Sequence, residues 1–365
     1  MRILQITDIM HPGSGIAQLL LSYNQFINNN RIQFDYIVES CDEKLKTVIR
    51  DLGGEVYIMP KLILSNVCKF KNFFDTFFQE HNYTIVHSHY YQIDFLVMLS
   101  AYDNGVKHYI SHSHNPKYSD FVLKSIRNFV LSIPIRFMAT EFCACSQPAG
   151  EFLYGRFILK CRKKTLYVLP NAINYLSFQY KASVRSDLRK RLGLSNELTI
   201  GIVGSLRPQK NQIFLLAVVK YIFDNYDPNI KCIMVGDGIS REVLSNEIKN
   251  YGLENNVIIT GFTDRAREYY NVFDCYVLPS VYEGFGLSLL EAQVNSLRCV
   301  CSTAVPLDPI ISEHVIRMPL SQGVKTWSEV IYSSANKGRF KDSYSQKYNV
   351  EIQASGLEEY YRNLV

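Results

Sequence analysis

Apolar residues in the first half of the chain form short β-prone runs, and longer amphipathic stretches separate these runs. Alternation of this kind is typical of parallel strands joined by helical crossovers. The predicted strands are Arg2–Thr7, Phe34–Val38, Glu55–Ile58, Thr84–His87, His108–Ser111, Phe142–Cys145 and Leu166–Val168. The predicted helices are Ile16–Ile27, Glu43–Leu52, Lys71–His81, Ile93–Tyr102, Phe121–Leu131 and Ala149–Tyr154.

The second half repeats this alternation after a polar, charged stretch within residues 172–197. Its predicted strands are Leu198–Val203, Lys231–Val235, Val257–Ile259 and Cys275–Leu278. Its predicted helices are Gln212–Asn225, Gly286–Asn295 and a C-terminal Val350–Arg362. The restart of the pattern indicates a second domain of the same class.

Two such halves predict an α/β protein with two Rossmann-like, doubly wound parallel sheets. Ligands of these sheets bind at the carboxyl ends of the strands, so we expect two domains that face each other across a cleft. The expected domains are residues 1–175, residues 176–345, and a helix within 346–365 that packs back on the first domain. A length of 365 residues agrees with two domains.

The formal net charge is small, +5 from 39 basic and 34 acidic residues. A dedicated nucleic-acid binder must neutralise many phosphates, so nucleic acid is not an expected partner. The basic excess is local, because residues 124–164 hold eight basic and two acidic residues. There and at Lys69–Phe78, cations alternate with apolar residues, which fits either an anionic membrane face or ordinary solvated helices.

Cysteine spacing and the first residues bear on the compartment. Nine cysteines, none in a C-x-x-C pair, indicate neither a disulfide framework nor a zinc site. The first apolar run meets a charge at Asp8, so no secretory signal is predicted. The uncharged stretch Ile9–Asn30 contains proline, glycines and asparagines and is not a membrane span. We expect a cytoplasmic protein, with peripheral contact to the cytoplasmic membrane as an open possibility.

The most informative segment, VYEGFGLSLLEAQ from Val281, follows the last predicted strand. Gly284 and Gly286 allow close approach of a ligand to backbone N–H groups, and N–H groups at a helix start attract a phosphate. Glu291 falls in an apolar helix, where a carboxylate needs hydrogen-bond donors such as a ribose diol. An ordinary helix-start loop with a solvated carboxylate is the alternative.

A second motif, GIVGSLRPQKN at residues 201–211, predicts a strand, a glycine turn and a helix start. It carries Arg207 and Lys210. Two cations beside a helix N-terminus suit a diphosphate leaving group, whose developing negative charge must be stabilised. A solvated basic turn is the alternative. VGDG at residues 235–238 is a further strand exit, suited to bounding a nucleoside pocket.

In the first half, Gly13, Ser14 and Gly15 form a loop after the first strand, with amides available to donor phosphates or to an acceptor. An ordinary strand-to-helix turn is equally compatible with these residues.

Four histidines follow two predicted strands as H-x-H pairs, His87 with His89 and His112 with His114. A neutral histidine at the carboxyl end of a strand can hydrogen-bond a sugar hydroxyl. Four histidines also suggest a metal, but no acidic ligand is adjacent and the spacing is not that of a helical or loop-borne site. No metal site is therefore predicted.

The EGFGLSLLE segment resembles the family 4 (group 1) retaining glycosyltransferases, which have the GT-B fold of two Rossmann-like domains. In that family the first glutamate lies by the donor sugar hydroxyls, loop amides meet the sugar and the diphosphate, and the second glutamate holds the ribose. The matching positions here are Glu283, Gly284, Phe285, Gly286, Leu287 and Glu291. The family also has a glycine-rich loop where Gly13, Ser14 and Gly15 stand.

Other family elements are present with changes. Lys210 matches the lysine of the family's G-R-x4-K element, whereas Ser205 stands at the usual arginine and Arg207 lies two residues later. The SHSHN segment is similar to the one whose histidine contacts the donor sugar, with His112 as the first choice and His114 as the second.

The resemblance implies transfer of a hexose from a nucleotide diphosphate sugar, with a UDP-sugar as the expected donor. The implied acceptor is a glycan or lipid-linked glycan of capsule or exopolysaccharide biosynthesis, and no metal or other cofactor is implied. The implied catalytic residues are Glu283, His112, Arg207 and Lys210, and Ser146 matches a serine that borders the cleft.

Two alternatives remain open at this stage. One is a sugar-nucleotide 2-epimerase, which shares the two-domain fold. The other is a non-catalytic, glycosyltransferase-like partner subunit, because Ser205, Ala172 and Asn174 depart from the family pattern.

Overall fold

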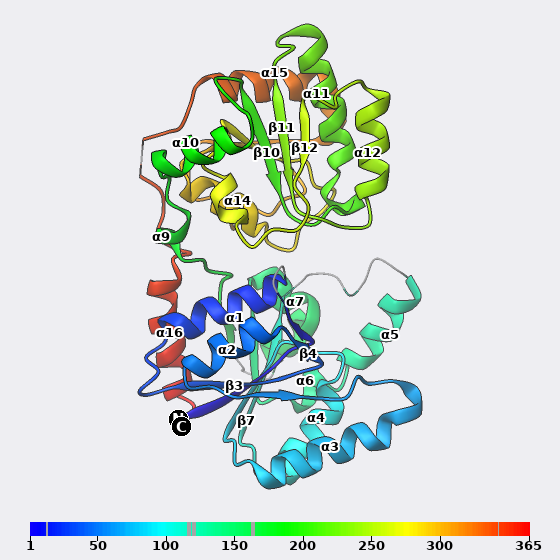
Figure 1. The fold of residues 1–365 in the computed structure, drawn as a ribbon. Helices are drawn as coiled ribbons and strands as arrows, with labels where there is room; N and C mark the ends of the chain where they lie inside the picture. The colour runs from blue at the N-terminus through cyan, green and yellow to red at the C-terminus, as the bar shows by residue number, and fades with distance from the viewer. Residues whose placement is uncertain (12–13, 115–117, 119–121, 162–164, 342) are drawn as a thin grey trace. The chain divides into compact units, whose positions relative to one another are not determined.

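A computed structural model describes residues 1–11, 14–114, 118, 122–161, 165–341 and 343–365. The chain forms two compact units, residues 1–173 with 348–365 and residues 174–347 (Figure 1). Each unit contains one large parallel sheet with helices around it, which confirms the predicted α/β class. No helix in the described part of the chain is long and apolar enough to cross a membrane.

The N-terminal unit is built on a seven-stranded parallel sheet in the order β5-β3-β1-β6-β7-β8-β9. Its strands are β1 (Arg2–Ile6), β3 (Gln33–Val38), β5 (Val56–Ile58), β6 (Ile85–Ser88), β7 (His108–Ser113), β8 (Glu141–Ala144) and β9 (Leu166–Val168). Ile3 pairs with Phe34 on one side and with Ile85 on the other, so β1 is central. Apolar cores lie on both faces of the sheet, so most residues of its central strands are buried.

The strands predicted in this half are all present. A separate pair, β2 (Ile9–Met10) and β4 (Ser40–Cys41), forms a small two-stranded sheet. The helices of the unit are α1 (Gly15–Phe26), α2 (Glu43–Asp51), α3 (Val67–Glu80), α4 (Asp94–Asp103), α5 (Val122–Ser132), α6 (Ile135–Met138), α7 (Gln147–Tyr154), α8 (Arg156–Cys161) and α16 (Val350–Arg362).

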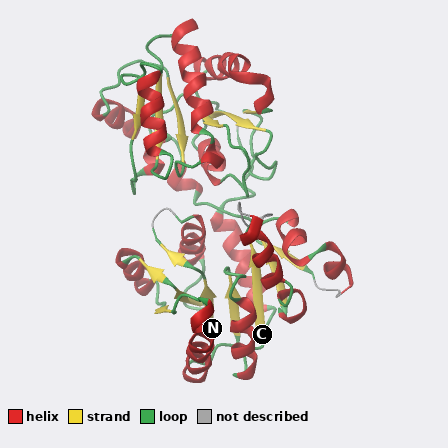
Figure 2. Cartoon of the chain, turned by 90° about the vertical axis from the view of Figure 1, so that its right-hand side faces the viewer, coloured by secondary structure: helices red, strands yellow, loops and turns green. Residues whose placement is uncertain are grey.

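The C-terminal helix α16 belongs to the N-terminal unit. Its buried residues Val350, Ala354, Leu357 and Tyr361 recur every three or four positions and so form one apolar face. This helix lies against α1, and the two chain ends lie close together in both ribbon views (Figures 1 and 2). The predicted return of the last helix to the first domain is confirmed.

The C-terminal unit contains a six-stranded parallel sheet in the order β12-β11-β10-β13-β14-β15. Its strands are β10 (Thr199–Val203), β11 (Lys231–Val235), β12 (Val257–Ile259), β13 (Cys275–Leu278), β14 (Arg298–Ser302) and β15 (Val315–Met318). Its helices are α9 (Tyr175–Phe178), α10 (Ala182–Arg191), α11 (Gln212–Asn225), α12 (Arg241–Asn250), α13 (Ala266–Tyr269), α14 (Leu287–Val294) and α15 (Gly323–Asn336). Short 3₁₀ turns are η1 (Leu64–Asn66) in the first unit and η2 (Pro208–Lys210) and η3 (Leu320–Gln322) in the second.

Several elements of this unit were not predicted. The polar stretch interpreted as the junction contains α10, a helix in which half of the residues are charged and which buries Leu188 and Arg189. Helix α12 likewise buries two apolar residues, Leu244 and Ile248, and both helices therefore lack a broad apolar stripe.

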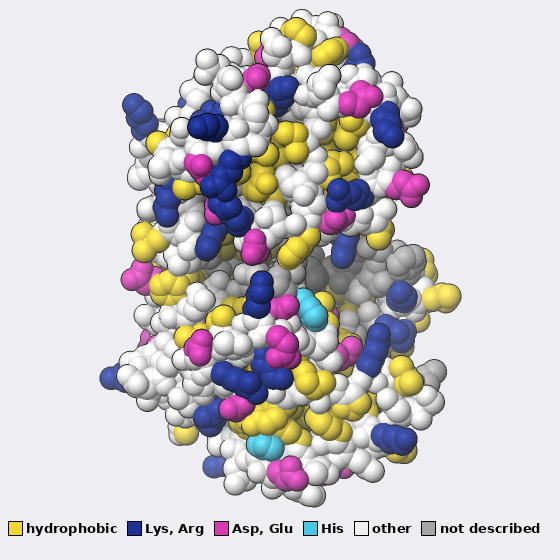
Figure 3. Space-filling view, in the orientation of Figure 1, with side chains coloured by type: hydrophobic (Ala, Val, Ile, Leu, Met, Phe, Trp, Pro, Cys, Tyr) yellow, Lys and Arg dark blue, Asp and Glu magenta, His cyan; other side chains and the backbone are white. Residues whose placement is uncertain are grey.

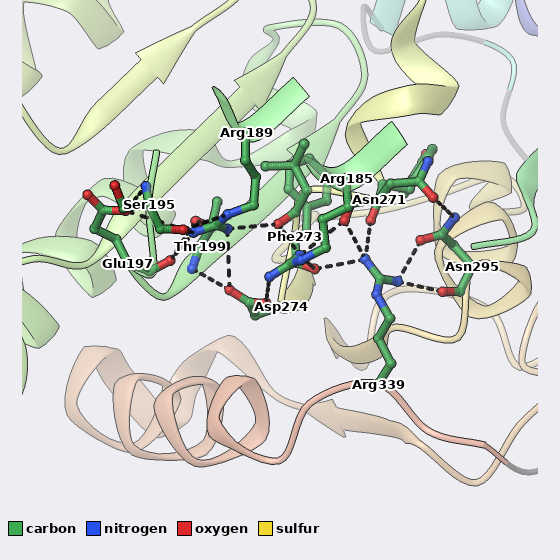
Figure 4. Close-up of polar contacts among 12 residues, drawn as sticks. Arg185, Arg189, Ser195, Glu197, Thr199, Asn271, Phe273, Asp274, Asn295 and Arg339 are labelled. Carbon is green, nitrogen blue, oxygen red and sulfur yellow. Dashed lines mark hydrogen bonds and ion pairs between the residues drawn. The ribbon is translucent and has the colours of Figure 1, made fainter. Parts of the chain in front are cut away.

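Partly buried arginines order the loop that precedes β13 (Figure 4). The Arg339 guanidinium donates to backbone carbonyls within residues 270–273 at 2.8 to 3.0 Å and to the carbonyl and side-chain oxygens of Asn295. Arg185 donates to Asp274 at 2.6 Å. Burial lowers the pKa of Arg339 to about 10. These guanidinium groups donate the hydrogen bonds that water would otherwise donate to carbonyls outside the sheet.

Candidate functional site

Each large sheet has a point at which the strand order changes direction, between β1 and β6 in one unit and between β10 and β13 in the other. Ligands of doubly wound sheets bind beyond the carboxyl ends of the strands at such points. In the C-terminal unit the relevant loops are residues 204–211 after β10 and 279–286 after β13. In the N-terminal unit they are the segment after β1 and the histidine-bearing ends of β6 and β7.

Three hydrogen bonds to backbone carbonyls join the two loops of the C-terminal unit. The Gln209 side chain donates to the backbone carbonyl of Tyr282 at 3.0 Å. The backbone carbonyl of Gln209 accepts from the N–H of Val281 at 2.8 Å. The Asn211 amide donates to the carbonyl of Pro279 at 3.2 Å. Backbone anchoring of this kind holds the functional side chains of both loops in one arrangement.

The VGDG segment packs directly against the first of these loops. A Cβ atom on Gly236 would lie 2.1 Å from the carbonyl oxygen of Gly204, and one on Gly238 would lie 2.4 Å from that of Leu206. Both distances are shorter than any real contact, so glycine is required at the two positions. The segment therefore packs beside the loop that carries Lys210, and its role at a nucleoside pocket stays a prediction.

Lys210 and Glu283 form an ion pair at the centre of this site. The Lys210 Nζ donates to Glu283 Oε1 at 2.7 Å, and the Ser280 hydroxyl donates to the same oxygen at 2.5 Å. The side chains are 15% and 6% exposed, respectively. Both hydrogen bonds go to Oε1, so the second carboxylate oxygen, Oε2, has no donor among the described residues and could accept one from a ligand.

The glycine loop turns directly into helix α14. Gly286 has φ +95°, a left-handed conformation that favours glycine, and it caps the helix that starts at Leu287. Phe285 is buried beside it, while Gly284 is partly exposed. The first N–H groups of a helix have no intrahelical partner, so this helix start is suited to an oxygen anion.

Glu291 occupies the second turn of α14 and is partly buried. The Tyr270 hydroxyl donates to its Oε2 at 2.5 Å. Burial raises the pKa of Glu291, and the Tyr270 hydrogen bond and the positive charge of Lys210 act in the opposite direction. The two glutamates thus bracket the glycine loop, with Lys210 near both.

Arg207 and Ser205 lie on the same loop as Lys210 but point into solvent. Both residues are exposed, and the Arg207 carbonyl accepts from the N–H of Lys210 at 2.9 Å. Within the described ranges, no acidic side chain pairs with the Arg207 guanidinium. The structure therefore brings together Lys210, Glu283 and Glu291 and leaves Arg207 at the rim.

In the N-terminal unit, two predicted serines serve as helix caps. The Ser14 Oγ accepts from the N–H of Ala17 at 3.4 Å and caps α1, which begins at Gly15. The buried Ser146 Oγ accepts from the N–H of Ala149 at 3.3 Å and caps α7. Gly13 lies outside the described residues.

The four histidines form one stack at the ends of β6 and β7. The ring centroids of His87 and His89 are 4.5 Å apart, and those of His112 and His114 are 4.1 Å apart. Nitrogen atoms also face each other between the pairs, at 3.1 Å for His87 and His112 and at 2.8 Å for His89 and His114. The two H-x-H motifs are thus brought into one cluster.

Burial keeps these histidines neutral. It lowers the pKa of His87 to about 3 and that of His114 to about 4, and it holds the pKa values of His89 and His112 well below 6.5. His112 is 1% exposed, whereas His114 is only partly buried. Of the two predicted sugar contacts, His114 is the one that reaches the surface of the unit.

Ring nitrogens of His89, His112 and His114 lie within 4.8 Å of one another, as do ligand atoms of His87, His112 and Cys143. These are distances at which a metal could be held, and the strand ends, rather than sequence spacing, create them. This convergence could not be predicted from the sequence, because the pairing of β6 with β7 produces it.

Four polar residues of the two clusters were missed. Ser280 and Tyr270 orient the glutamates, and Gln5 and Tyr361 hydrogen-bond the histidines. Ser280 comes two residues after β13, a position typical of site residues, and could have been marked from the sequence. Gln5 lies inside a strand, and Tyr361 lies near the C-terminus, so neither is marked by local pattern.

The sequence of the C-terminal unit matches a known family. A family profile described as glycosyl transferases group 1 matches residues 184–326. The putative glycosyltransferase EpsF of Bacillus subtilis is 27% identical over 351 residues, which cover 94% of this chain and 90% of EpsF. A UDP-Gal:alpha-D-GlcNAc-diphosphoundecaprenol alpha-1,3-galactosyltransferase of Escherichia coli is 25% identical over 79% of this chain and 76% of its own length.

Solved structures share the fold of the whole chain. Anabaena Alr3699/HepE in complex with UDP and glucose aligns over 100% of both chains with a TM-score of 0.77 and 18% identity. The glycosyltransferase WaaG of lipopolysaccharide biosynthesis aligns over 99% of this chain and 95% of its own, with a TM-score of 0.70 and 12% identity. The relatives, the family profile and the shared fold agree with the resemblance noted in the sequence. Residues 184–326 thus match the group 1 glycosyltransferase family, and the chain has the GT-B fold.

Proposed function

We propose that this enzyme transfers a hexose from a UDP-sugar to a hydroxyl of a glycan or lipid-linked glycan during surface polysaccharide biosynthesis, with retention of anomeric configuration. The observation that carries the proposal is the Lys210–Glu283 pair beside the start of α14, with Glu291 one turn further on. A cation, a helix start and two carboxylates at one strand-order switch point suit a nucleotide diphosphate sugar.

Each group has a distinct role in this proposal. Lys210, the N–H groups at Gly286 and Leu287, and the rim cation Arg207 stabilise the charge that develops on the departing diphosphate. Glu291 accepts hydrogen bonds from the ribose diol, and Glu283 accepts from a hydroxyl of the sugar. Because these groups supply the charge stabilisation, the proposal includes no metal ion.

Retention is proposed from the family resemblance. The acceptor hydroxyl attacks on the face from which the diphosphate leaves, and a departing phosphate oxygen takes the acceptor proton. None of the candidate residues is assigned as a covalent nucleophile. The His112 and His114 region of the N-terminal unit is assigned to sugar hydroxyls, and the segment around Ser14, Gly15 and Ser146 to the edge of the substrate site.

Relatives support the choice of donor and acceptor class. The E. coli relative is named for a UDP-galactose donor and a diphosphoundecaprenol acceptor, and Anabaena Alr3699/HepE was crystallised with UDP-glucose. A capsular polysaccharide glycosyltransferase of Staphylococcus aureus is 23% identical over 78% of this chain. These names support a UDP-hexose and a surface glycan for the present chain.

The test is a donor panel with purified full-length protein. UDP-, GDP- and ADP-sugars are incubated with and without lipid-linked glycan acceptors, and both nucleotide release and sugar transfer are measured. We expect transfer from a UDP-hexose. Interconversion of donor sugars without an acceptor would indicate the epimerase alternative, and nucleotide binding without turnover would indicate the non-catalytic one.

Two glutamate variants test the roles. Glu291→Ala is expected to lose nucleotide binding, whereas Glu283→Ala is expected to bind nucleotide and fail to transfer. Glu242→Ala, which changes an exposed glutamate on α12, is the matched control. Full activity in both site variants would show that the site is assigned wrongly.

A membrane surface is the second partner that we propose. Helix α5 and the segment after it expose apolar side chains in helical spacing, at Val122, Leu123, Ile126, Phe129, Val130, Ile133 and Phe137. Phe157 on α8 is 75% exposed. Lys124, Arg127, Arg156 and Lys160 belong to the same helices, and α5 carries no acidic residue. Figure 3 shows cations and apolar side chains interspersed at the edge where Figure 1 draws α5.

An apolar helix face with a basic border fits an anionic lipid surface. The measurement is co-sedimentation with vesicles of phosphatidylglycerol or of phosphatidylcholine. We expect binding to the anionic vesicles, and loss of it when Leu123 and Ile126 are both changed to Gln. The matched control changes two exposed apolar residues of α12 and α16, Val243 and Ile352, to Gln. Equal binding by the α5 variant and the control would refute this partner.

A further inference from the structure

Two chains of hydrogen bonds meet at the side-chain amide of Gln5, a buried residue of β1. In the first chain, Gln5 Nε2 donates to the Tyr361 hydroxyl at 3.2 Å, and that hydroxyl lies 2.6 Å from His87 Nδ1. His87 Nε2 then lies 3.1 Å from His112 Nδ1.

The second chain starts at the other end of the same amide. Gln5 Oε1 lies 2.9 Å from His89 Nε2, and His89 Nδ1 lies 2.8 Å from His114 Nε2. One glutamine thus connects to every histidine of the cluster through its two polar atoms.

The chemistry of the amide gives the first chain a direction. An amide nitrogen only donates, so the Tyr361 oxygen accepts from Gln5 and its single proton goes to His87 Nδ1. A neutral His87 then carries its proton on Nε2 and donates it to His112 Nδ1. His112 consequently carries its own proton on Nε2.

The second chain runs in the opposite direction but ends in the same tautomer. An amide oxygen only accepts, so His89 carries its proton on Nε2 and has a lone pair on Nδ1. His114 donates its Nε2–H to that lone pair. These proton positions hold for neutral imidazole rings, and burial keeps the rings neutral because it lowers the pKa values of all four histidines.

We propose that Gln5 and Tyr361 are positioning residues that hold all four histidines in the Nε2–H tautomer. The second hydrogen bond of a histidine decides which nitrogen is protonated, and here that bond comes ultimately from one amide. His112 then presents an Nε2–H donor that has no partner among the described residues, and the partly buried His114 keeps a lone pair on Nδ1.

A consequence for substrate recognition rests on the proposed function. His114 offers an acceptor to a sugar hydroxyl, and its lowered pKa makes it a hydrogen-bond partner rather than a general base. Tyr361 comes from α16, so the last helix contributes an atom to the network as well as an apolar face. A metal held by His89, His112 and His114 would need a lone pair from each ring, whereas in this network the unpaired nitrogen of His112, Nε2, carries a proton.

The test is ¹⁵N NMR of histidine-labelled full-length protein at pH 7.5, together with metal analysis of the same sample. Ring nitrogen shifts distinguish Nε2–H, Nδ1–H and metal-bound imidazole. We expect Nε2–H for His87, His89, His112 and His114. An Nδ1–H signal from any of the four, or a stoichiometric metal with metal-bound shifts, would overturn the proposal.

Tyr361→Phe breaks the first chain alone. His87 and His112 are expected to become mixtures of tautomers, while His89 and His114 stay Nε2–H. Tyr360→Phe is the matched control, because it removes a neighbouring buried hydroxyl that has no hydrogen-bond partner in the described part of the chain. An equal response of the two variants, or of the two histidine pairs, would refute the role of Tyr361.

A second variant, Gln5→Glu, replaces the donor end of the amide by an acceptor. Tyr361 would then donate to residue 5, and His87 and His112 are expected to change to Nδ1–H while His89 and His114 do not. The spectrum of a folded variant in which His87 and His112 keep Nε2–H would contradict the proposed direction of the first chain.

Transfer assays separate this inference from the proposed function. With an active enzyme, Tyr361→Phe is expected to lower kcat/KM about tenfold and Tyr360→Phe to leave it unchanged, since a partner that fixes a histidine tautomer has effects of about that size. If the tautomers are as proposed but no sugar is transferred, the proposed function fails alone. If sugar is transferred but the tautomers differ, the inference fails alone.

Discussion

The histidine cluster of the N-terminal unit and the Lys210–Glu283 pair of the C-terminal unit stand at equivalent positions in two similar sheets. The histidines lie at and just after the ends of β6 and β7, and the ion pair follows β10 and β13, so both are near the point where the strand order changes direction. The histidines are neutral and are held by neutral partners, Gln5 and Tyr361. The second site holds a lysine and a carboxylate 2.7 Å apart.

Under the proposed function, this difference lets the same edge of two similar sheets bind two kinds of ligand group, uncharged hydroxyls and a charged diphosphate. A neutral cluster with ordered protons selects for hydroxyl groups by hydrogen-bond direction and costs little to desolvate. An ion pair attracts a charged ligand, and a diphosphate can take over Lys210 from Glu283. Two units of one fold class are thereby suited to different parts of a reaction.

The largest expected effect comes from removing the cation of the C-terminal site. Lys210→Ala should lower the transfer rate by about 10²–10³-fold, the usual loss when one preorganised group that stabilises developing charge is removed. The measurement is kcat with a UDP-sugar. Lys220→Ala, which removes an α11 lysine paired with Asp224, should keep full activity. If the Lys210 variant kept more than half of the normal rate, Lys210 would not be the group that stabilises the charge of the departing diphosphate.

The next effect concerns stability of the C-terminal unit alone. Arg339→Met should destabilise it by about 3 kcal/mol, because the Tyr270 carbonyl loses its guanidinium donor and the Asn271 and Phe273 carbonyls keep only that of Arg185. Trp327, the one tryptophan of the sequence, is buried in this unit and reports its unfolding by urea through fluorescence. A loss below about 1 kcal/mol would indicate that water satisfies those carbonyls.

Acid should act with opposite sign on the histidine cluster of the N-terminal unit and on Glu291 of the C-terminal unit. The histidines have folded pKa values below the unfolded value of 6.5, so the unfolded chain binds more protons and the N-terminal unit loses stability as pH falls from about 6.5 toward 4. Each histidine contributes up to about 1.4 kcal/mol per pH unit. The folded pKa of Glu291 is raised, so this group favours the folded C-terminal unit as pH falls toward 4.5.

The measurement compares far-UV circular dichroism with Trp327 fluorescence during acidification. Circular dichroism should report loss of structure while Trp327 still reports a folded C-terminal unit. Simultaneous loss of both signals, or earlier loss of the fluorescence signal, would show that the histidine cluster does not set the acid sensitivity.

The smallest expected effect is that of the rim cation. Arg207→Ala should lower kcat/KM about tenfold, which corresponds to one charge-assisted hydrogen bond of about 1.5 kcal/mol. Arg265→Ala, which removes an exposed arginine paired with Glu268, is the control. A loss as large as that of Lys210→Ala would move Arg207 from the rim into the centre of the site.

Much of this fold could be predicted because parallel strands are buried on both faces and stand out as apolar runs. The helices α11 and α16 were predicted with their observed ends, Gln212–Asn225 and Val350–Arg362. Strands β14 and β15 were missed, since RCVCS and VIRM mix charge with short apolar segments. Their strand character comes from pairing with neighbours in the sheet.

Only part of the candidate site could likewise be predicted from local sequence. Glu283 and Glu291 are eight residues apart around two glycines, so local sequence marks them, and Lys210 follows a strand and a turn. The contact between Lys210 and Glu283 spans 73 positions and needs the pairing of β10 with β13. Gln5 and Tyr361 are 356 positions apart, and only the tertiary fold brings their side chains into contact.

The chain leaves the N-terminal unit after Ile173 and returns to it at Tyr348, and these two points are hydrogen-bonded to each other. The Ile173 N–H donates to the Tyr348 carbonyl and the Val350 N–H donates to the Ile173 carbonyl, both at 3.0 Å. The C-terminal unit is therefore an insertion in the chain of the N-terminal unit. During synthesis the ribosome must release residues 348–365 before the first unit can complete its core, so the second unit, made entirely within residues 174–347, can finish folding first. The adjacent crossing points also mark where a short linker could replace the insertion and give a separately expressible N-terminal domain.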